Sequence, residues 1–223
     1  MPNKLEKFAD IERFENCFSF FFEQIERGFP TKGKWHKEYF KNDNPLILEL
    51  GCGRGEYTVG LGQANRSKNY IGIDVKGNRI WTGANYALDH KLNNIAFIRT
   101  RIDFIEHCFG EAEVDEIWIT FPDPQPQKPR ERKRLTCQRF LDRYKKILKP
   151  NGIIHLKTDS TSLYDYTLEV IAENGHELIW HTNDLYKNCP EDRKELTAIK
   201  TYYEKLFTDK GEDIKYIAFR LSR

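Results

Sequence analysis

Long apolar runs are absent from this chain. No stretch of about 18 consecutive apolar residues, the length that a membrane-spanning helix requires, occurs among its 223 residues. The charged opening residues Met1-Pro2-Asn3-Lys4-Leu5-Glu6 also lack the apolar centre of a signal peptide. The five cysteines are odd in number, widely spaced and without a CxxC pair, and the six histidines show no metal-ligand spacing. We therefore expect a cytoplasmic protein that contacts no membrane, holds no metal and has no disulfide framework.

Internal repeats, low-complexity tracts and linkers are absent as well, and the chain length suits one large α/β domain. The apolar patch of Phe18, Phe20, Phe21 and Phe22 is interpreted as part of an N-terminal helix that packs on this domain. The expected organisation is an N-terminal helical extension over residues 1–31 and a main domain over residues 32–223. The sequence does not decide between a monomer and a homodimer.

A strong excess of one charge sign is absent from the chain as a whole, whose formal net charge is +2. The positive charge is nevertheless concentrated, because residues 128–149 hold ten basic side chains against only Glu131 and Asp142. This window carries +8, which leaves −6 for the rest of the chain. Such a concentration is typical of a surface that binds a polyanion, and the alternative is a solvated helix face with a basic bias. The basic residues are Lys128, Arg130, Arg132, Lys133, Arg134, Arg139, Arg143, Lys145, Lys146 and Lys149.

Short apolar runs alternate with amphipathic segments along the chain. This alternation predicts an α/β fold with a mostly parallel sheet of seven strands, helices on both faces and an antiparallel edge strand. Pro122, Pro124, Pro126 and Pro129 forbid a regular helix or a central strand, so an irregular basic loop should follow the fourth strand. The expected strands cover residues 46–50, 70–74, 96–99, 116–121, 153–157, 177–181 and 214–220. The expected helices cover residues 56–64, 77–90, 103–109, 135–148, 160–173 and 197–207.

A glycine-rich turn follows the first of these strands. Residues 46–56 read Leu-Ile-Leu-Glu-Leu-Gly-Cys-Gly-Arg-Gly-Glu, which predicts a strand, a tight turn and a helix start. A nicotinamide dinucleotide would favour GxGxxG, but Glu56 stands in the place of the third glycine. An acid followed by GxGxG is instead the spacing associated with S-adenosylmethionine (AdoMet). The carboxylate of Glu49 suits the cationic amino-acid moiety of that cofactor.

A second acid ends the next strand, Tyr70-Ile71-Gly72-Ile73-Asp74. A carboxylate at the tip of this strand can accept hydrogen bonds from both ribose hydroxyls of a nucleoside. Together the two motifs fit one βαβ unit and favour an AdoMet site over a nicotinamide site. The alternative is a glycine turn with an ordinary surface aspartate.

The motif Trp118-Ile119-Thr120-Phe121-Pro122-Asp123-Pro124 ends the fourth strand and enters the basic loop. With this motif the chain resembles the bacterial tRNA (guanine-N7-)-methyltransferase family from about Lys32 to the C-terminus. The matching segments are Leu48–Gly55, Tyr70–Asp74, Phe121–Pro124, Leu156–Asp159 and Thr201–Glu204. Five motifs in order and at family spacing make the resemblance specific. It implies the Rossmann-like fold of class I AdoMet-dependent methyltransferases over residues 32–223.

The resemblance also implies a reaction and its residues. The expected reaction methylates N7 of a variable-loop guanosine in tRNA and leaves S-adenosylhomocysteine, and Asp123 is the expected catalytic residue. The implied cofactor-binding residues are Glu49, Gly51, Asp74, Arg101, Ile102 and Asp123. The implied substrate-binding residues are Gln127, Asp159, Thr201, Tyr202, Tyr203 and Glu204. The implied RNA-binding residues are Lys128, Arg130, Arg132, Lys133 and Arg134.

The chain departs from the family pattern at three positions. Gln125 and Gln127 stand where the family has Trp and Lys, and Lys128, one position later, is the candidate substitute for that lysine. Arg101 stands where the family has an acid or amide near adenine. The adenine contact is therefore expected from the backbone of Arg101 and Ile102 or from Asp103.

Alternatives remain open at this stage. Asp123 could be a turn carboxylate before Pro124, and Asp159 could cap the helix that starts at Ser160. Thr201 and Glu204 could form a pair on one helix face. For the whole chain, the alternatives are a small-molecule AdoMet methyltransferase and a non-catalytic RNA-binding protein that retains the fold.

Overall fold

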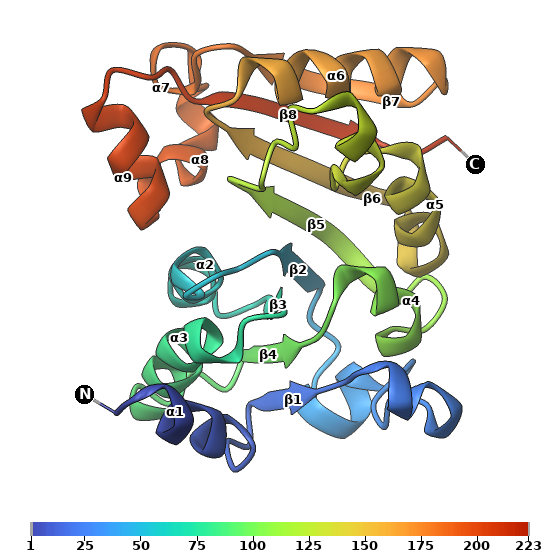
Figure 1. Ribbon diagram of the computed structural model, residues 1–223, viewed down its shortest axis with the longest axis vertical. Helices are drawn as coiled ribbons and strands as arrows, with labels where there is room; N and C mark the ends of the chain where they lie inside the picture. The colour runs from blue at the N-terminus through green and yellow to red at the C-terminus, as the bar shows by residue number, and fades with distance from the viewer. Residues whose placement is uncertain (1, 223) are drawn as a thin grey trace.

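The computed structural model describes residues 2–222, which form one mixed sheet of eight strands. The strand order across the sheet is β1-β4-β3-β2-β5-β6-β8-β7 (Figure 1). Neighbours from β1 to β6 in this order pair in parallel, whereas β8 pairs antiparallel with both β6 and β7. The strands are β1 (Cys17–Ser19), β2 (Leu46–Leu50), β3 (Asn69–Asp74), β4 (Ile95–Arg99), β5 (Val114–Thr120), β6 (Leu148–Thr158), β7 (Glu177–Thr182) and β8 (Lys215–Arg220).

All seven expected strands are confirmed, and so is the antiparallel edge. The central strand β2 is buried along its whole length, because helices cover the sheet on both sides. The chain order reverses at β2: β3 and β4 follow on one side of it, and β5 and β6 lie on the other. In open α/β sheets, ligands bind at the carboxyl ends of the strands beside such a reversal. The fold therefore places a binding site at the ends of β2 and β5.

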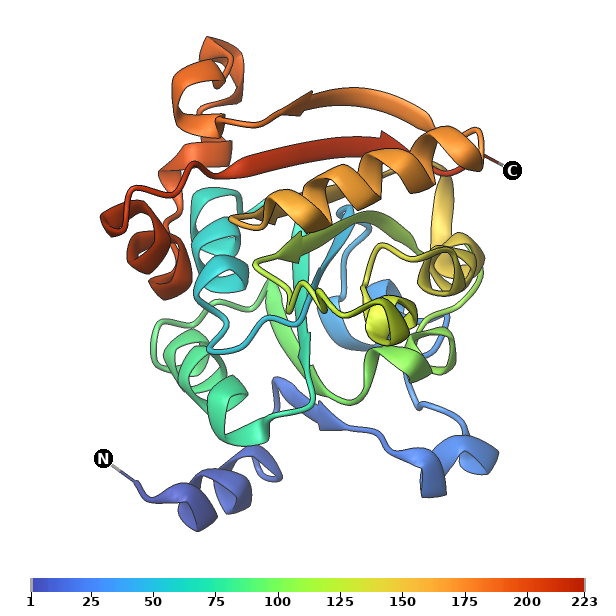
Figure 2. The ribbon, with the colours of Figure 1, turned by 45° about the horizontal axis from the view of Figure 1, so that its top comes forward.

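Helices cover both faces of the sheet. Helices α4, α5 and α6 bury side chains on one face, and α1, α2, α3, α7 and α8 bury theirs on the other. Figure 2 shows α6 lying over β8 and β6. The α-helices are α1 (Lys4–Ile11), α2 (Glu56–Ala64), α3 (Gly77–Asp89), α4 (Ile105–Cys108), α5 (Gln138–Ile147), α6 (Thr161–Glu173), α7 (Leu185–Asn188), α8 (Glu195–Ala198) and α9 (Tyr202–Asp209). Short helices of other types are the 3-10 helices η1 (Phe22–Arg27), η3 (Ile102–Phe104), η4 (Lys128–Lys133) and η5 (Glu191–Arg193) and the π-helix η2 (Trp35–Phe40).

Strand β1 corrects two expectations: the helix over the Phe18–Phe22 patch and the count of seven strands. Cys17, Phe18 and Ser19 pair in parallel with β4 at the edge of the sheet. Cys17 packs into the cluster around Phe97 on one face, whereas the Phe18 ring lies 5.2 Å from the Trp35 ring on the other. Side chains that alternate between faces require an extended backbone, so a helix was the wrong interpretation. Residues 17–19 thus belong to the main sheet.

Two further expectations need smaller corrections. The basic loop is not wholly irregular, because Lys128–Lys133 form the 3-10 helix η4, with Pro129 in its first turn where a missing N–H costs no hydrogen bond. The expected helix over residues 197–207 is divided into α8 and α9, since Thr201 is extended and caps the start of α9. Among the described residues, no helix is long and apolar enough to cross a membrane.

Candidate active site

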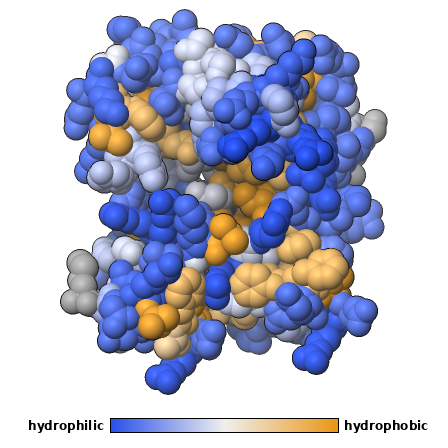
Figure 3. All heavy atoms as spheres, viewed as in Figure 1, coloured by the Kyte–Doolittle hydropathy of each residue, from blue (hydrophilic) through white to orange (hydrophobic). Residues whose placement is uncertain are grey.

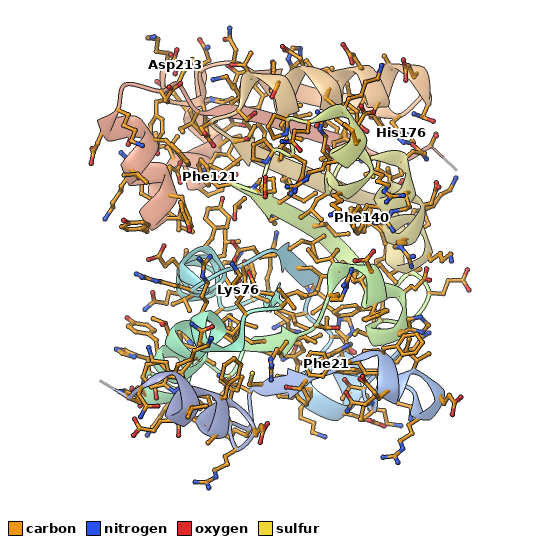
Figure 4. All side chains as sticks on the ribbon, viewed as in Figure 1. Phe21, Lys76, Phe121, Phe140, His176 and Asp213 are labelled. Carbon is orange, nitrogen blue, oxygen red and sulfur yellow. The ribbon has the colours of Figure 1, made fainter. Side chains whose placement is uncertain are left out.

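A cavity of about 690 Å³ opens at the carboxyl ends of β2, β3, β5 and β6. Figure 4 labels Phe121 and Lys76, which contribute to this cavity from opposite sides. Figure 3 shows hydrophobic side chains in the middle of this face with hydrophilic side chains around them. The sequence-predicted residues that line the cavity are Glu49, Gly51, Asp74, Asp123, Lys133, Asp159, Thr201, Tyr202 and Tyr203. Five motifs that are far apart in the chain therefore contribute to one site.

The glycine turn after β2 forms the floor of this cavity. Gly51, Gly53 and Gly55 have φ angles of 76°, 55° and 74°, a conformation that other residues rarely adopt. A Cβ atom on Gly51 or Gly53 would meet no neighbour within 4 Å, so open space lies beside this backbone. A Cβ atom on Gly55 would lie 2.6 Å from the Phe97 ring. The first two glycines thus leave room for a ligand, and the third permits close packing under the turn.

Glu49 is buried, and both of its carboxylate oxygens accept hydrogen bonds. Oε2 accepts the backbone N–H of Thr58 at 2.9 Å and also the Thr58 hydroxyl, and Oε1 accepts the Thr120 hydroxyl at 2.6 Å. These bonds tie β2 to the start of α2 and to the end of β5. Burial raises the pKa of Glu49 to about 7 although the hydrogen bonds oppose the shift. Glu49 therefore supplies the cavity with a carboxyl group whose charge changes near neutral pH.

Asp74 ends β3 and fixes the turn that follows. Its two carboxylate oxygens accept the backbone N–H of Gly53 at 3.0 Å and that of Lys76 at 2.8 Å. The side chain lines the cavity and also a neighbouring cavity of about 650 Å³. Asp74 thus stands at the junction of the two cavities, as a ribose-binding carboxylate would.

The neighbouring cavity contains the residues expected near adenine. Arg101, Ile102 and Asp103 line it together with Gly51 and Leu135. Asp103 is engaged by two arginines: its carboxylate lies 3.2 Å from Arg101 and 3.0 Å from Arg139. Both carboxylate oxygens of Asp103 are thus engaged by arginine side chains, and the expected adenine contact of this segment stays a prediction.

The segment after β5 turns sharply into the cavity. Phe121 has a φ of 47°, which is uncommon for a residue other than glycine, and its N–H donates to the Lys157 carbonyl at 2.8 Å. Asp123 is exposed at the cavity wall and its Oδ1 accepts the N–H of Gln125 at 3.1 Å. This turn contact is the one foreseen by the alternative interpretation of Asp123. It occupies only one carboxylate oxygen and is compatible with a second partner in the cavity.

Arg134 holds this segment in place from behind. It is only 7% exposed, and its Nε donates to the carbonyls of Pro124 and Gln125 at 3.2 and 3.3 Å. Its guanidinium lies 4.2 Å from the centre of the Tyr166 ring. Arg134 therefore faces inward, and its role in the structure is to fix the loop that carries Asp123.

The other basic residues divide into paired and unpaired groups. Arg139, Arg143, Lys146 and Lys149 form ion pairs with carboxylates of the same face. Lys145 on α5 and the four side chains Lys128, Arg130, Arg132 and Lys133 are exposed and have no ion pair within the described residues. These four, here called the η4 basic surface, remain free to contact an anion.

Asp159 follows β6 and lines the cavity with its side chain, while burial raises its pKa above the ordinary value. The helix cap is supplied by the next residue, because the Ser160 hydroxyl accepts the Leu163 N–H at 3.2 Å. The capping alternative for Asp159 is therefore wrong. Its carboxylate is available to a ligand.

Helix α9 brings two tyrosines to the cavity. Thr201 caps the helix by accepting the Glu204 N–H at 3.2 Å, and Tyr202 and Tyr203 are 53% and 42% exposed. Tyr203 stacks on Phe207, which in turn stacks on Phe121. The result is a continuous row of aromatic rings from α9 to the turn after β5.

Glu204 does not line the cavity. Its side chain is fully buried, forms an ion pair of 2.7 Å with the equally buried Lys157 and accepts the Tyr186 hydroxyl at 2.8 Å. Gln127 is likewise outside the cavity: it is exposed and precedes η4. The substrate contacts that the family resemblance implies for these two residues remain predictions.

Several cavity or supporting residues were missed by sequence reasoning. Thr120, Phe121 and Phe207 line the cavity, and Lys157 anchors α9 from beneath. Lys157 carried a usable signal, because a lysine inside the apolar strand 153–157 needs a buried partner. The aromatic row carried none, since Phe207 and Phe121 are 86 positions apart.

Within residues 2–222, no group of three or more His, Cys, Asp or Glu side chains is arranged to hold a metal ion.

The glycine turn, the two carboxylates and the sheet order together define the class of fold: a Rossmann-like methyltransferase of class I. Solved structures support this assignment. The 16S rRNA methyltransferase KamB matches with a TM-score of 0.58 at 12% identity over 91% of this chain and 93% of that chain. Phosphoethanolamine N-methyltransferase 2 of Haemonchus contortus, solved in complex with AdoMet, matches with a TM-score of 0.51 at 14% identity over 91% and 53% of the two chains.

Sequence comparisons give the family. The family model described as "Putative methyltransferase" matches residues 43–217. The tRNA (guanine-N(7)-)-methyltransferase of Bacteroides fragilis is 52% identical over 98% of this chain and 86% of its own length. The enzyme of the same name from Christiangramia forsetii is 50% identical over 98% of both chains. The chain belongs to the tRNA (guanine-N(7)-)-methyltransferase family.

The residues of the cavity fit the cofactor AdoMet. Open space lies beside Gly51 and Gly53, and Glu49 faces this space with a carboxyl group suited to a cationic ligand. Asp74 lines both cavities, so its carboxylate would meet a ribose that joined an adenine in the second cavity to the rest of the cofactor in the first.

Proposed function

We propose that this protein transfers a methyl group from AdoMet to N7 of a variable-loop guanosine in tRNA, giving 7-methylguanosine and S-adenosylhomocysteine. The observation that carries the proposal is one cavity that joins the glycine turn, Asp123, Asp159 and the tyrosines of α9, with the η4 basic surface beside it. The names of the relatives from Bacteroides fragilis and Christiangramia forsetii agree with this activity.

AdoMet, when bound, supplies an electrophilic methyl group on a sulfonium. The guanine N7 lone pair is available at neutral pH, so it can form the new N–C bond as the S–C bond breaks, without prior removal of a proton. The protein's contribution is to hold N7 in line with the methyl group, and such positioning can supply roughly 7–11 kcal/mol in favourable cases.

Two carboxylates of the cavity, those of Asp123 and Asp159, have a clear use in this reaction. Methylation leaves a positive charge on the purine ring, and its N1–H and exocyclic amine become stronger hydrogen-bond donors. Asp123 and Asp159 can accept from these groups and stabilise the developing charge, which is a preorganised electrostatic effect. Neither carboxylate needs to remove a proton in the step itself.

The remaining parts of the site act on the substrate before the reaction. The rings of Tyr202 and Tyr203 provide faces on which an unstacked base can lie. The η4 basic surface attracts phosphates without reading sequence. The protein thus has separate means of binding the RNA backbone and the target base.

The test uses unmodified tRNA and methyl-labelled AdoMet. New 7-methylguanosine is mapped by borohydride reduction and aniline cleavage of the strand. Cleavage at one guanosine of the variable loop supports the proposal, whereas label in a metabolite pool and none in tRNA supports a small-molecule methyltransferase. Binding of tRNA together with no binding of AdoMet supports a non-catalytic RNA-binding protein.

A further inference from the structure

Helix α2, which begins directly after the glycine turn, is fastened to the start of helix α9. The Glu56 carboxylate accepts the backbone N–H of Tyr202 through Oε2 at 2.7 Å, although the two residues are 146 positions apart. Arg54 places its guanidinium carbon 5.6 Å from the centre of the Tyr202 ring. The residues on either side of Gly55 therefore both contact Tyr202, one through its backbone and one through its ring.

Helix α2 also packs closely against the segment that precedes α9. Gly60 lies one turn after Glu56, and a Cβ atom there would stand 2.7 Å from Ile199. Glycine at this position lets the segment before α9 approach α2 more closely than any larger residue would allow. Both segments therefore contribute residues to this contact: Glu56 and Gly60 from α2, and Ile199 and Tyr202 from the other segment.

The Glu56 contact also satisfies a requirement of α9 itself. Tyr202 is the first residue of the helix, and its N–H has no partner within the helix. A carboxylate at a helix N-terminus is favoured by the helix dipole. Glu56 thus fixes the point at which α9 starts, and so the direction in which Tyr202 and Tyr203 leave the backbone.

Tyr202 and Tyr203 are not core residues. They are 53% and 42% exposed and line the same cavity as Arg54 and Glu56. Exposed aromatic faces at the mouth of a cavity provide a surface on which an unstacked purine can lie. Their placement relative to the glycine turn sets the distance between such a purine and the cofactor.

We propose that Glu56 is a positioning residue for the target base. Its carboxylate holds the start of α9 against the cofactor-binding turn, so that the tyrosines present a purine at a fixed distance from the methyl donor. The inference rests on the proposed function and adds to it a residue that acts through its contact with the start of α9.

The test compares Glu56→Ala with Glu56→Gln in the full-length protein. Glutamine keeps an oxygen that can accept the Tyr202 N–H, whereas alanine removes it. We expect Glu56→Ala to lower kcat/KM for tRNA about tenfold, because small displacements of a reactant are costly, while the Kd for AdoMet stays within about twofold. Glu56→Gln should restore kcat/KM to within about twofold of the parent protein.

The matched control is Glu169→Ala, which removes the same charge from the exposed surface of α6, outside the cavity. Hydrogen exchange at the Tyr202 amide supplies a readout that does not depend on catalysis. It should accelerate in Glu56→Ala and stay slow in Glu56→Gln and Glu169→Ala. Faster exchange in Glu56→Ala together with full activity would overturn the proposal.

Two other outcomes would also overturn it: Glu56→Gln as impaired as Glu56→Ala, or a parallel loss of AdoMet affinity. Failure of the proposed function is distinguishable, because the parent protein would then form no 7-methylguanosine in tRNA. The exchange rate of the Tyr202 amide would still report the contact in that case.

Discussion

The ammonium group of Lys157 lies 2.7 Å from the carboxylate of Glu204, and both side chains are completely enclosed. Lys157 belongs to β6 and also donates to the Leu196 carbonyl at 2.8 Å, while Glu204 belongs to α9. The pair therefore joins the sheet to the two short helices beside the cavity. Burial lowers the pKa of Lys157, and the charge of Glu204 opposes that shift.

Removing one member of this pair should be strongly destabilising, because the other would remain as an uncompensated buried charge. We expect Lys157→Met and Glu204→Gln each to lower the free energy of unfolding by about 3–5 kcal/mol. The double variant Lys157→Met/Glu204→Gln should lose less than the sum of the two single losses. Urea denaturation followed by circular dichroism measures all three. Strict additivity would mean that the two groups do not interact.

The affinity for AdoMet should depend on pH through Glu49. Burial raises its pKa from the ordinary 4.5 to about 7, so the group is neutral in mild acid and becomes anionic as the pH rises through neutrality. A cationic ligand favours the anionic form. Calorimetric titration should therefore show tighter AdoMet binding at pH 8 than at pH 6, by up to about tenfold for each pH unit below the pKa.

The matched variant is Glu49→Gln, in which this dependence should disappear. Comparison at each pH cancels the ionisation of the cofactor itself, which is common to both proteins. The folding stability of the cofactor-free protein should depend on pH in the opposite sense, because Glu49 lowers it as the pH rises. The raised pKa of Glu49 contributes to the stability of the fold. This contribution is complete below about pH 4.5, where the group is neutral in both the folded and the unfolded protein, and it is lost as the pH rises through about 7. Glu49→Gln should then melt higher than the parent at pH 8, and an unchanged melting temperature would contradict the assignment.

Asp123 and Asp159 should affect the methyl-transfer step more than binding. Asp123→Asn and Asp159→Asn keep the size of each side chain but remove its charge. Single-turnover rates should fall on the order of 10- to 100-fold, since a preorganised contact to developing charge is lost. The Kd for AdoMet serves as the control measurement. Parental rates in both variants would exclude the proposed electrostatic role.

The η4 basic surface and Arg134 should give different defects. Replacing Arg130, Arg132 and Lys133 together by Ala should weaken tRNA binding for every sequence and flatten the dependence of log Kd on log salt by about two to three. Arg134→Ala should leave that slope near the parental value and lower kcat, because Arg134 supports the turn that carries Asp123. Filter binding between low and moderate salt measures the slopes. An unchanged slope in the triple variant would place the RNA contacts elsewhere.

The main features of this fold were readable from the sequence because each has a local cause. The buried strands have apolar runs of characteristic length, and the glycine turn has an acid and three glycines at fixed spacing. The Phe18–Phe22 patch was misread for the same reason. Its three-residue strand is set by pairing with β4 and by packing against Trp35, which no local pattern contains.

The cavity residues were predicted where the motif itself determines the geometry, as at Gly51, Asp74 and Asp159. Arg134 and Glu204 could not be placed in this way. The sequence shows their charge, but only the packed structure shows that Arg134 turns inward and that Glu204 meets Lys157. The side chain of a charged residue near a motif can point into solvent or be buried with a partner, and contacts with residues far away in the sequence decide which occurs.

Strand β1 has a consequence for how much of the chain must be kept for solubility. The span matched by the family model begins at residue 43 and so leaves out β1 and η2. A protein shortened to that span would uncover the hydrogen-bonding edge of β4 and remove Trp35, which is fully buried against Phe29 and Phe109. An exposed strand edge beside a bared apolar surface that includes Phe109 is a template for aggregation. The shortened protein should therefore precipitate or self-associate even though it would retain every residue of the active-site cavity.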